Sequence, residues 1–195
     1  MVPITLITLL VAAAIGLLTG GRLGAIARLR LTAPALAFAA LALAVVASVL
    51  TLPRAGSIAL LAGSYAFAAA FLIVNRRARG AISAGLAILA IGWSLNATVI
   101  ALNGGMPLSR AAYDASGQRA PIVEGKGGFE RIVIADRDTT LSWLGDVIPV
   151  RPLHQVISPG DVALLAGMAL LILGAMHLRP LDAGNPDFHR AQQAR

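Results

Sequence analysis

Residues 81–102 read AISAGLAILAIGWSLNATVIAL and contain no charged side chain. A helix that crosses a lipid bilayer needs about 17–25 predominantly apolar residues, and this stretch supplies them without interruption. It ends at Asn103-Gly104-Gly105, and glycine is common just beyond the last residue of a helix. The stretch therefore predicts a helix that spans a membrane.

Four other apolar stretches have a similar length. They cover residues 3–19, 34–52, 57–74 and 161–178. Proline stands at the start of two of the five stretches and just beyond the end of two, where its missing N–H breaks no internal hydrogen bond. The pattern predicts an all-α membrane protein, built as a bundle of about five transmembrane helices.

The composition also favours lipid over water as the surrounding solvent. Of the 195 residues, 57% are hydrophobic and 13% are charged, with a mean hydropathy of +0.79. A soluble domain has about 25% charged residues, so this chain has too few charges to cover a globule of its size. Because the sequence has no cysteine, disulfides, thiolate metal sites and cysteine nucleophiles are excluded. We expect no cofactor.

Arginine is concentrated in some of the predicted connections, and this bias sets the orientation of membrane helices. The second loop holds Arg54 alone, whereas the first loop, the third loop and the tail each hold three arginines: Arg22, Arg28, Arg30, Arg76, Arg77, Arg79, Arg179, Arg190 and Arg195. We therefore expect a multi-pass protein of the cell membrane, with the tail 179–195 in the cytoplasm and the N-terminus outside. Since the arginines lie between apolar segments, the net charge of +7 does not indicate nucleic acid as a partner.

The segment 103–160 is too polar to span a membrane and too long to be a turn. Within its charged first half, Arg131-Ile132-Val133-Ile134 has the composition of a short strand. Residues 141–150, LSWLGDVIPV, are apolar but too few to span, which is typical of an interfacial or re-entrant stretch. Trp143 favours the headgroup level of the bilayer. We therefore expect a long extracytoplasmic loop that folds back onto the membrane.

Small and polar residues repeat along one side of two predicted helices. The first set is Gly85, Gly92, Asn96 and Asn103, whose members are seven, four and seven residues apart. The second set is Gly160, Gly167 and Gly174, whose members are seven residues apart. At about 100° per residue, each set stays on one side of its helix. Small residues let membrane helices approach closely. We therefore expect the helices at 81–102 and 161–178 to pack through these two stripes.

Asn96 is the polar side chain that lies deepest in a predicted span. Its amide needs partners where water is absent, which predicts either a hydrogen bond to another helix or a contact with a substrate or ion. His154, in the outer segment, has no neighbour at the spacing of metal ligands. We interpret it as a surface histidine and expect no metal site.

Two carboxylates, Asp146 and Asp161, follow glycine residues near the predicted outer boundary of the membrane. Ser158 or Asp161 can cap the helix that begins there, because either side chain meets free N–H groups at the positive end of the helix dipole. Alternatively, Asp146 and Asp161 form an acid/base dyad that shares a proton. Both interpretations stay open, since sequence spacing does not show whether the two carboxylates meet.

Three motifs give the chain a family resemblance. They are Asn103-Gly104-Gly105-Met106-Pro107, Leu144-Gly145-Asp146-Val147-Ile148-Pro149 and Val156-Ile157-Ser158-Pro159-Gly160-Asp161-Val162. With them the chain resembles a bacterial integral membrane family, the domain of unknown function 5317. The resemblance implies a small helical membrane protein and no particular activity, and it draws attention to Asn103, Asp146 and Asp161.

The layout is also similar to that of lipoprotein signal peptidase, which has one aspartate after a short apolar stretch and another at the start of its last helix. Asp146 and Asp161 occupy similar places, although Pro-Gly-Asp stands here instead of Asn-Ala-Asp. Three hypotheses follow. We favour a polytopic membrane protein with a binding role toward a partner membrane protein, a second copy of itself or a small apolar ligand. The alternatives are a membrane-embedded aspartic hydrolase and a small-solute transporter, and few intramembrane charges and no clear inverted repeat argue against the transporter.

Overall fold

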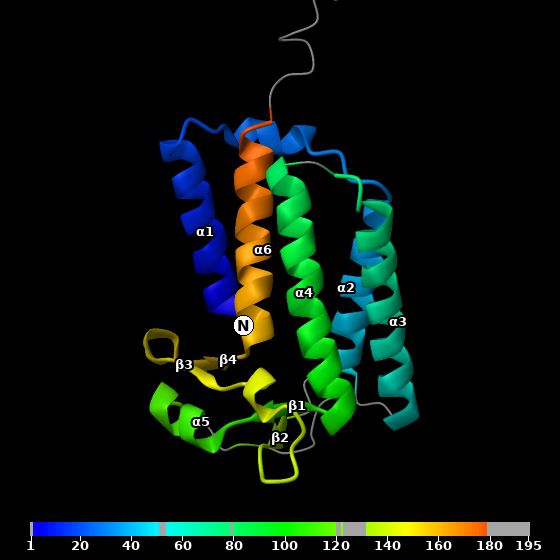
Figure 1. Cartoon of the computed structure of the whole chain (residues 1–195), viewed down its shortest axis with the longest axis vertical. Coiled ribbons are helices and arrows are strands. Elements are labelled where there is room, and N and C mark those ends of the chain that lie inside the picture. Colours follow the sequence, from blue (N-terminus) through cyan, green and yellow to red (C-terminus); the bar gives the residue numbers. More distant parts are fainter. Residues whose placement is uncertain (1, 51–53, 79, 120–121, 123–131, 179–195) are drawn as a thin grey trace, which may run out of the picture.

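The computed structural model places long helices side by side along the longest axis of the molecule (Figure 1). It describes residues 2–50, 54–78, 80–119, 122 and 132–178. The long helices are α1 (Val2–Leu18), α2 (Pro34–Val49), α3 (Arg54–Val74), α4 (Gly80–Asn103) and α6 (Pro159–Met176). Each of them coincides with one of the apolar stretches of the sequence.

Some helix ends differ from the predicted ones by a few residues. α6 begins at Pro159, before the predicted start at residue 161, because Ser158 is the N-cap and proline takes the first helical turn. α2 ends at Val49, and residues 51–52 of the predicted second span lie outside the described residues. The tail 179–195 lies outside them as well.

By length and composition, α4 and α6 can each cross a membrane. The first three helices contain shorter apolar stretches, which are Pro3–Leu18, Pro34–Ala47 and Ala59–Val74. The described chain is therefore mostly helical and has two candidate membrane-spanning helices.

On these helices small apolar side chains are buried and many large ones are exposed, which is the opposite of the pattern in soluble proteins. The buried hydrophobic residues described in α1 and α2 are the alanines Ala12, Ala40 and Ala47. Larger side chains of the same helices are exposed, among them Leu10 (62%) and Phe38 (70%). Soluble proteins most often bury Leu, Ile and Phe, whereas small residues between helices are typical of membrane proteins.

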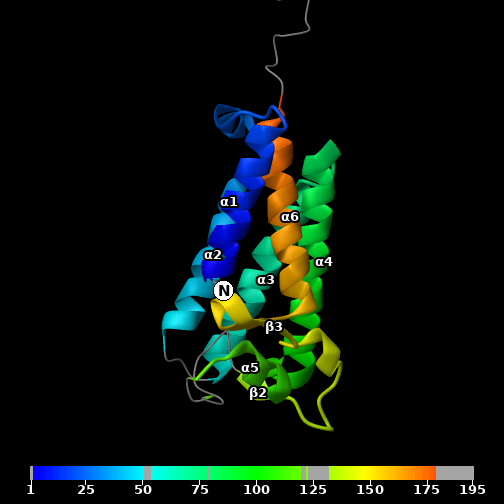
Figure 2. The same ribbon diagram turned by 90° about the vertical axis from the view of Figure 1, so that its left-hand side faces the viewer.

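α6 lies at the centre of the bundle, between α1 and α4 (Figures 1 and 2). Its most extensive contact is with α4, and α2 packs mainly against α3. The rings of Tyr65 in α3 and Trp93 in α4 meet edge to face, with centroids 4.6 Å apart and planes inclined by 62°. This aromatic contact joins the α2–α3 pair to the other three helices.

The two glycine stripes lie between α4 and α6, which confirms the predicted packing. A Cβ atom on Gly92 would lie 2.5 Å from the carbonyl oxygen of Gly160, and one on Gly85 would lie 3.0 Å from that of Gly167. Because the close neighbours are backbone atoms, no side-chain rotation would make room for a larger residue. Glycine is what allows the two backbones to approach this closely.

The described residues between Gly104 and Ser158 form a small layer at one end of the bundle, which we call the cap (Figure 1). Its described elements are β1 (Met106–Leu108), α5 (Arg110–Ser116), β2 (Ile132–Ile134), the 3₁₀ helices η2 (Ser142–Leu144) and η3 (Arg151–Leu153), β3 (Ile148–Val150) and β4 (Gln155–Ile157). β1 and β2 pair in parallel, and β3 and β4 pair antiparallel.

These strands correct the expectation of an all-α fold. The short strand expected at 131–134 is present as β2, whose β-branched residues favour extended backbone. The apolar stretch 141–150 is not a single element, because it contains η2 followed by β3. Within η2, Leu144 is buried against Val99 and Ile100 of α4, while Trp143 is 63% exposed.

The two ends of the bundle carry different segments. The cap lies at the same end as the N-terminus (Figure 1). The opposite end carries η1 (Leu23–Arg28), the connection between α3 and α4, and the end of α6. Arg22, Arg28 and Arg76 therefore lie at the end away from the cap, which is the grouping that the arginine bias predicts.

Candidate functional site

Three side chains at the cap end of the α4–α6 interface form a closed set of hydrogen bonds. Asn96 donates from Nδ2 to Asp161 Oδ1 (2.9 Å), and its Oδ1 accepts from the Ser158 hydroxyl (2.9 Å). The Ser158 hydroxyl oxygen accepts from the Asp161 backbone N–H (3.0 Å), and Asp161 Oδ2 accepts from the Ser158 backbone N–H (3.0 Å). Each of these polar groups thus has a partner within the apolar bundle, as a membrane interior requires.

Two of these bonds are the capping box of α6. Ser158 is the N-cap residue, and Asp161 stands three residues later, where its carboxylate reaches back to the start of the helix. Ser158 is completely buried and Asp161 is 8% exposed. Both residues therefore cap the helix, and Asn96 makes the interhelical hydrogen bond that was one of its two predicted roles.

Gly160 gives Asn96 the room to reach this cap. A Cβ atom on Gly160 would overlap the side-chain oxygen of Asn96 and would lie 2.8 Å from the carbonyl oxygen of Gly92. Between Ser158 and Asp161, proline thus helps to start the helix and glycine leaves space for the neighbouring helix.

Asn103, the last residue of α4, holds the cap against the bundle. Its Nδ2 donates to the carbonyl of Val99 (2.8 Å) and to that of Thr140 (2.9 Å), and its Oδ1 accepts from the Thr140 N–H (2.9 Å). The amide therefore pairs with both backbone groups of one cap residue. Gly104 follows with a φ of +67°, the left-handed conformation that commonly ends a helix.

Asp146, in the second motif, is hydrogen-bonded through its backbone to residues in and just after the first motif. Its backbone N–H donates to the Pro107 carbonyl (2.7 Å), and its carbonyl accepts from the Ser109 N–H (3.0 Å). Gly145 is buried, and a Cβ atom there would overlap Pro107. β3 continues the second motif and pairs with β4, which leads into the third. The three motifs thus form one continuous contact between cap and bundle, which we call the junction.

The two aspartates have different surroundings. Asp161 Oδ2 accepts the Ser158 N–H bond of the helix cap, and its Oδ1 accepts from Asn96 of α4, whereas Asp146 is half-buried beside β1. These bonds assign Asp161 to capping, and the acid/base dyad of the pair stays a prediction.

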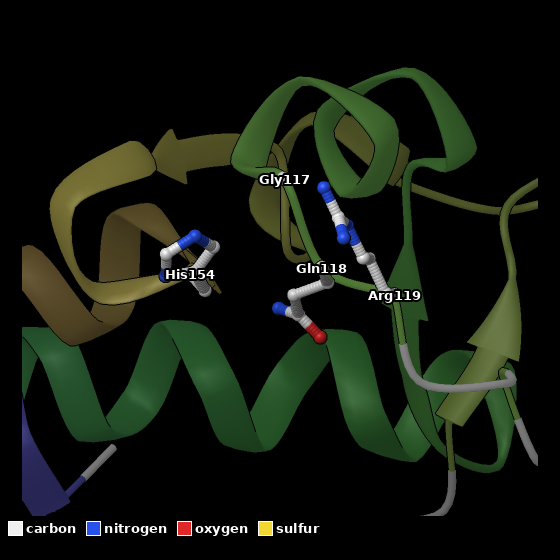
Figure 3. A pocket seen from close by; sticks show the side chains of 4 residues that line it. All are labelled: Gly117, Gln118, Arg119 and His154. Carbon is white, nitrogen blue, oxygen red and sulfur yellow. The ribbon is translucent and has the colours of Figure 1, made fainter.

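His154 lies in the turn between η3 and β4 and is exposed, as expected for a surface histidine. With Gly117, Gln118 and Arg119 it lines a surface cavity of about 780 Å³ (Figure 3). Among the described residues, no group of three His, Cys, Asp or Glu side chains is placed to hold a metal ion.

Asn75 repeats the arrangement of Asn103 at the other end of the bundle, and its role was not predicted. Its Oδ1 accepts from the Thr32 N–H (2.7 Å), and its Nδ2 donates to the carbonyls of Thr32 (2.9 Å) and Phe71 (2.8 Å). A signal was present in the sequence, because each asparagine directly follows the last apolar residue of a helix.

His177 joins the end of α6 to the end of α1. Its Nδ1 lies 2.8 Å from the carbonyl oxygen of Leu173, and its Nε2 lies 3.2 Å from that of Thr19. Both oxygens are acceptors, so an imidazolium with two N–H groups satisfies them together. The hydrogen bond to Leu173, followed by the one to Thr19, raises the pKa of His177 above its usual 6.5.

A protein-family model matches residues 25–173, and its description is Family of unknown function (DUF5317). The chain belongs to this family. The matched part of this DUF5317 protein reaches from η1 into α6 and contains all three motifs of the junction, so the resemblance seen in the sequence is confirmed. Comparisons with curated proteins and with solved structures gave no match.

Proposed function

We propose that this DUF5317 protein is a five-span membrane protein whose cap is a binding surface outside the cytoplasm. The reversed distribution of apolar side chains supports the membrane placement, since Ala47 is buried while Phe38 is 70% exposed. The arginine-rich connections lie at the end opposite the cap. The positive-inside bias assigns that end to the cytoplasm, so the cap and the N-terminus lie outside.

The binding role is supported by the way the junction uses its polar side chains. Asn96 is bonded to Asp161 and Ser158, and Asn103 is bonded to the backbone of Thr140. The bonds of Asn103 hold the cap on the bundle, and those of Asn96 hold the start of α6 against α4. Because these groups are paired with protein, we assign the binding role to exposed residues of the cap such as Arg137 and Asp138.

A partner membrane protein or a second copy of this chain is the partner that we propose. The cap lies at the ends of the helices (Figure 1). In a bilayer, that position would let it contact another membrane protein. Trp143 exposes 63% of its surface there, and tryptophan is enriched among the residues that dominate protein interfaces.

The hydrolase alternative has less support from the described residues. It needs one aspartate to act as a base and the other as an acid, but Asp161 is 8% exposed and accepts a hydrogen bond at each carboxylate oxygen. The bonds of a helix cap are sufficient to explain its position. No observation among the described residues favours the transporter.

Photo-crosslinking in intact cells tests the binding role. A photoreactive amino acid in place of Trp143 is expected to give a discrete protein product, whereas the same substitution at Phe38, exposed on α2, is expected to react with lipid. Asn103→Ala removes the bonds to Thr140 and should weaken the Trp143 product while the chain stays in the membrane fraction. The binding role is wrong if neither Trp143 nor the exposed cap residues Arg137 and Asp138 give any protein product.

A further inference from the structure

We propose that the cap cavity lined by Gln118, Arg119 and His154 binds a phosphate group, which either a lipid headgroup or free phosphate supplies. Phosphate would be a small ligand of the cap, in addition to the proposed protein partner. This inference depends on the proposed function only because that function places the cap at the membrane surface. The cavity is open to solvent, and its volume of about 780 Å³ is large enough for a phosphate group.

Two basic residues, Arg119 and His154, line the cavity. Figure 3 shows His154 on one side and Gln118 and Arg119 on the other. No hydrogen bond or ion pair joins the Arg119 guanidinium or the His154 ring to another described residue. Two donor-bearing side chains without a described protein partner therefore face a space large enough for an anionic group.

The two walls of the cavity are held together by a third basic residue. Arg151, in the same 3₁₀ helix that precedes His154, donates from Nε to the carbonyl of Ala115 near the end of α5 (3.0 Å). The carbonyl end of a helix carries negative partial charge, and the Arg151 guanidinium offsets that charge close to the cavity. The same bond joins the turn that carries His154 to α5, which precedes Gln118 and Arg119.

The backbone at His154 sets the position of its ring. His154 ends η3 with a φ of +48°, a left-handed conformation that histidine adopts more often than most residues other than glycine. The ring packs against Gly117, where a Cβ atom would lie 3.3 Å from His154 Cδ2. The left-handed turn therefore places the ring beside the end of α5, at one wall of the cavity.

The donors of the cavity suit a phosphate group. A guanidinium can bind two phosphate oxygens at once through parallel N–H groups. The imidazole of His154 and the amide of Gln118 supply further N–H donors. The proposed function places the cap at the membrane surface, where lipid headgroups carry phosphates.

Two probes test the site on the full chain purified in an uncharged detergent. The first is inorganic phosphate, whose effect on the melting temperature is compared with that of chloride at equal ionic strength. The second is phosphatidylglycerol, whose retention is counted by native mass spectrometry against diacylglycerol, which lacks phosphate. We expect binding of at least one probe, weakened about tenfold or more in the double variant Arg119→Gln/His154→Gln, in line with the loss of charge-assisted hydrogen bonds.

Arg137→Gln is the matched control, because it removes one positive charge from an exposed cap residue that does not line the described cavity. It should bind both probes as the wild type does. Arg119→Gln alone repeats the comparison if the double variant does not fold. Retention of the lipid without a response to phosphate identifies a headgroup site, and a response to phosphate identifies a free anion.

Equal binding by the wild type and the double variant, or no binding of either probe to the wild type, overturns the phosphate site. An equal loss of binding in Arg137→Gln also overturns it, because the effect would then be one of net charge. These results leave the protein-binding proposal intact if Trp143 still gives its crosslinked product, so the two proposals fail separately.

Discussion

Three asparagines each satisfy polar groups that the ends or faces of helices leave unpaired. Asn75 and Asn103 pair with both the N–H and the carbonyl of one distant residue, Thr32 and Thr140. Asn96 bonds to the side chains at the N-cap of α6. A carboxamide offers donors and an acceptor without a charge, so it can complete such pairs without the cost of placing an ion in an apolar bundle.

We expect His177 to make the contact between α1 and α6 sensitive to pH. Because its bonds to Leu173 and Thr19 raise its pKa above 6.5 in the folded protein, folding favours the protonated ring. Its stabilising contribution is complete below pH 6.5 and is lost as the pH rises through the raised pKa. We expect the melting temperature of the wild type to exceed that of His177→Gln at about pH 5.5, with a smaller difference at about pH 8.5.

Arg137→Gln is the control for this measurement, since Arg137 is exposed in the cap and keeps its charge over this pH range. Its melting temperature should follow that of the wild type with a constant offset. If the difference between the wild type and His177→Gln does not change with pH, the imidazolium does not hold the two helices together.

At the scale of elements, the α4–α6 interface depends on glycine. A Cβ atom on Gly92 would lie 2.5 Å from the Gly160 carbonyl oxygen and 2.8 Å from the Leu164 nitrogen, and neither backbone atom can move alone. We expect Gly92→Ala to lower the free energy of unfolding by about 1–3 kcal/mol, the usual cost of overpacking. Unfolding in mixed micelles with increasing dodecyl sulfate measures this loss.

Gly24→Ala is the matched control, because a Cβ atom on Gly24 would have no neighbour within 4 Å. Its free energy of unfolding should stay within about 0.5 kcal/mol of the wild type. If Gly92→Ala is as stable as Gly24→Ala, the α4–α6 packing described above is incorrect.

The helices could be predicted from sequence because apolar length alone defines them, and the glycine stripes because a period of seven survives in a helix. The strands of the cap are different. Each has three residues, too few for an alternating pattern to appear. These strands form because they pair with distant residues, as Met106 does with Ile132. Only β2, with its run of β-branched residues, could be predicted from its own sequence.

In the junction too, contacts between residues close in sequence could be predicted and contacts with distant residues could not. The capping box could be predicted because Ser158 and Asp161 are close in sequence and have the residue types that caps require. The partner of Asn103 could not be, since Thr140 lies 37 residues away and contributes only backbone groups. Every residue except proline offers the same N–H and carbonyl, so the residue type of Thr140 does not identify it as the partner of Asn103.

At the scale of the whole molecule, the described surface explains the composition. Side chains such as Leu18 (87% exposed) and Leu41 (61% exposed) cover the outside of the helices, and most of the charged residues lie at the two ends of the bundle or in the tail. In water this surface would be one large apolar patch, which soluble monomers avoid. In a bilayer it faces hydrocarbon, and the cap and the arginine-rich end lie at the two aqueous boundaries.

This arrangement predicts which residues a reagent reaches from each side. Because the chain has no cysteine, single substitutions report directly. In intact cells from which any outer barrier has been removed, a membrane-impermeant maleimide should label Arg137→Cys in the cap. It should label Arg28→Cys in η1 only after the membrane is permeabilised. Phe38→Cys, facing lipid, should stay unlabelled throughout, since a thiol in hydrocarbon does not ionise to the reactive thiolate. Labelling of Arg28→Cys but not Arg137→Cys in intact cells would reverse the orientation, and labelling of both would mean that no membrane separates the cap from η1.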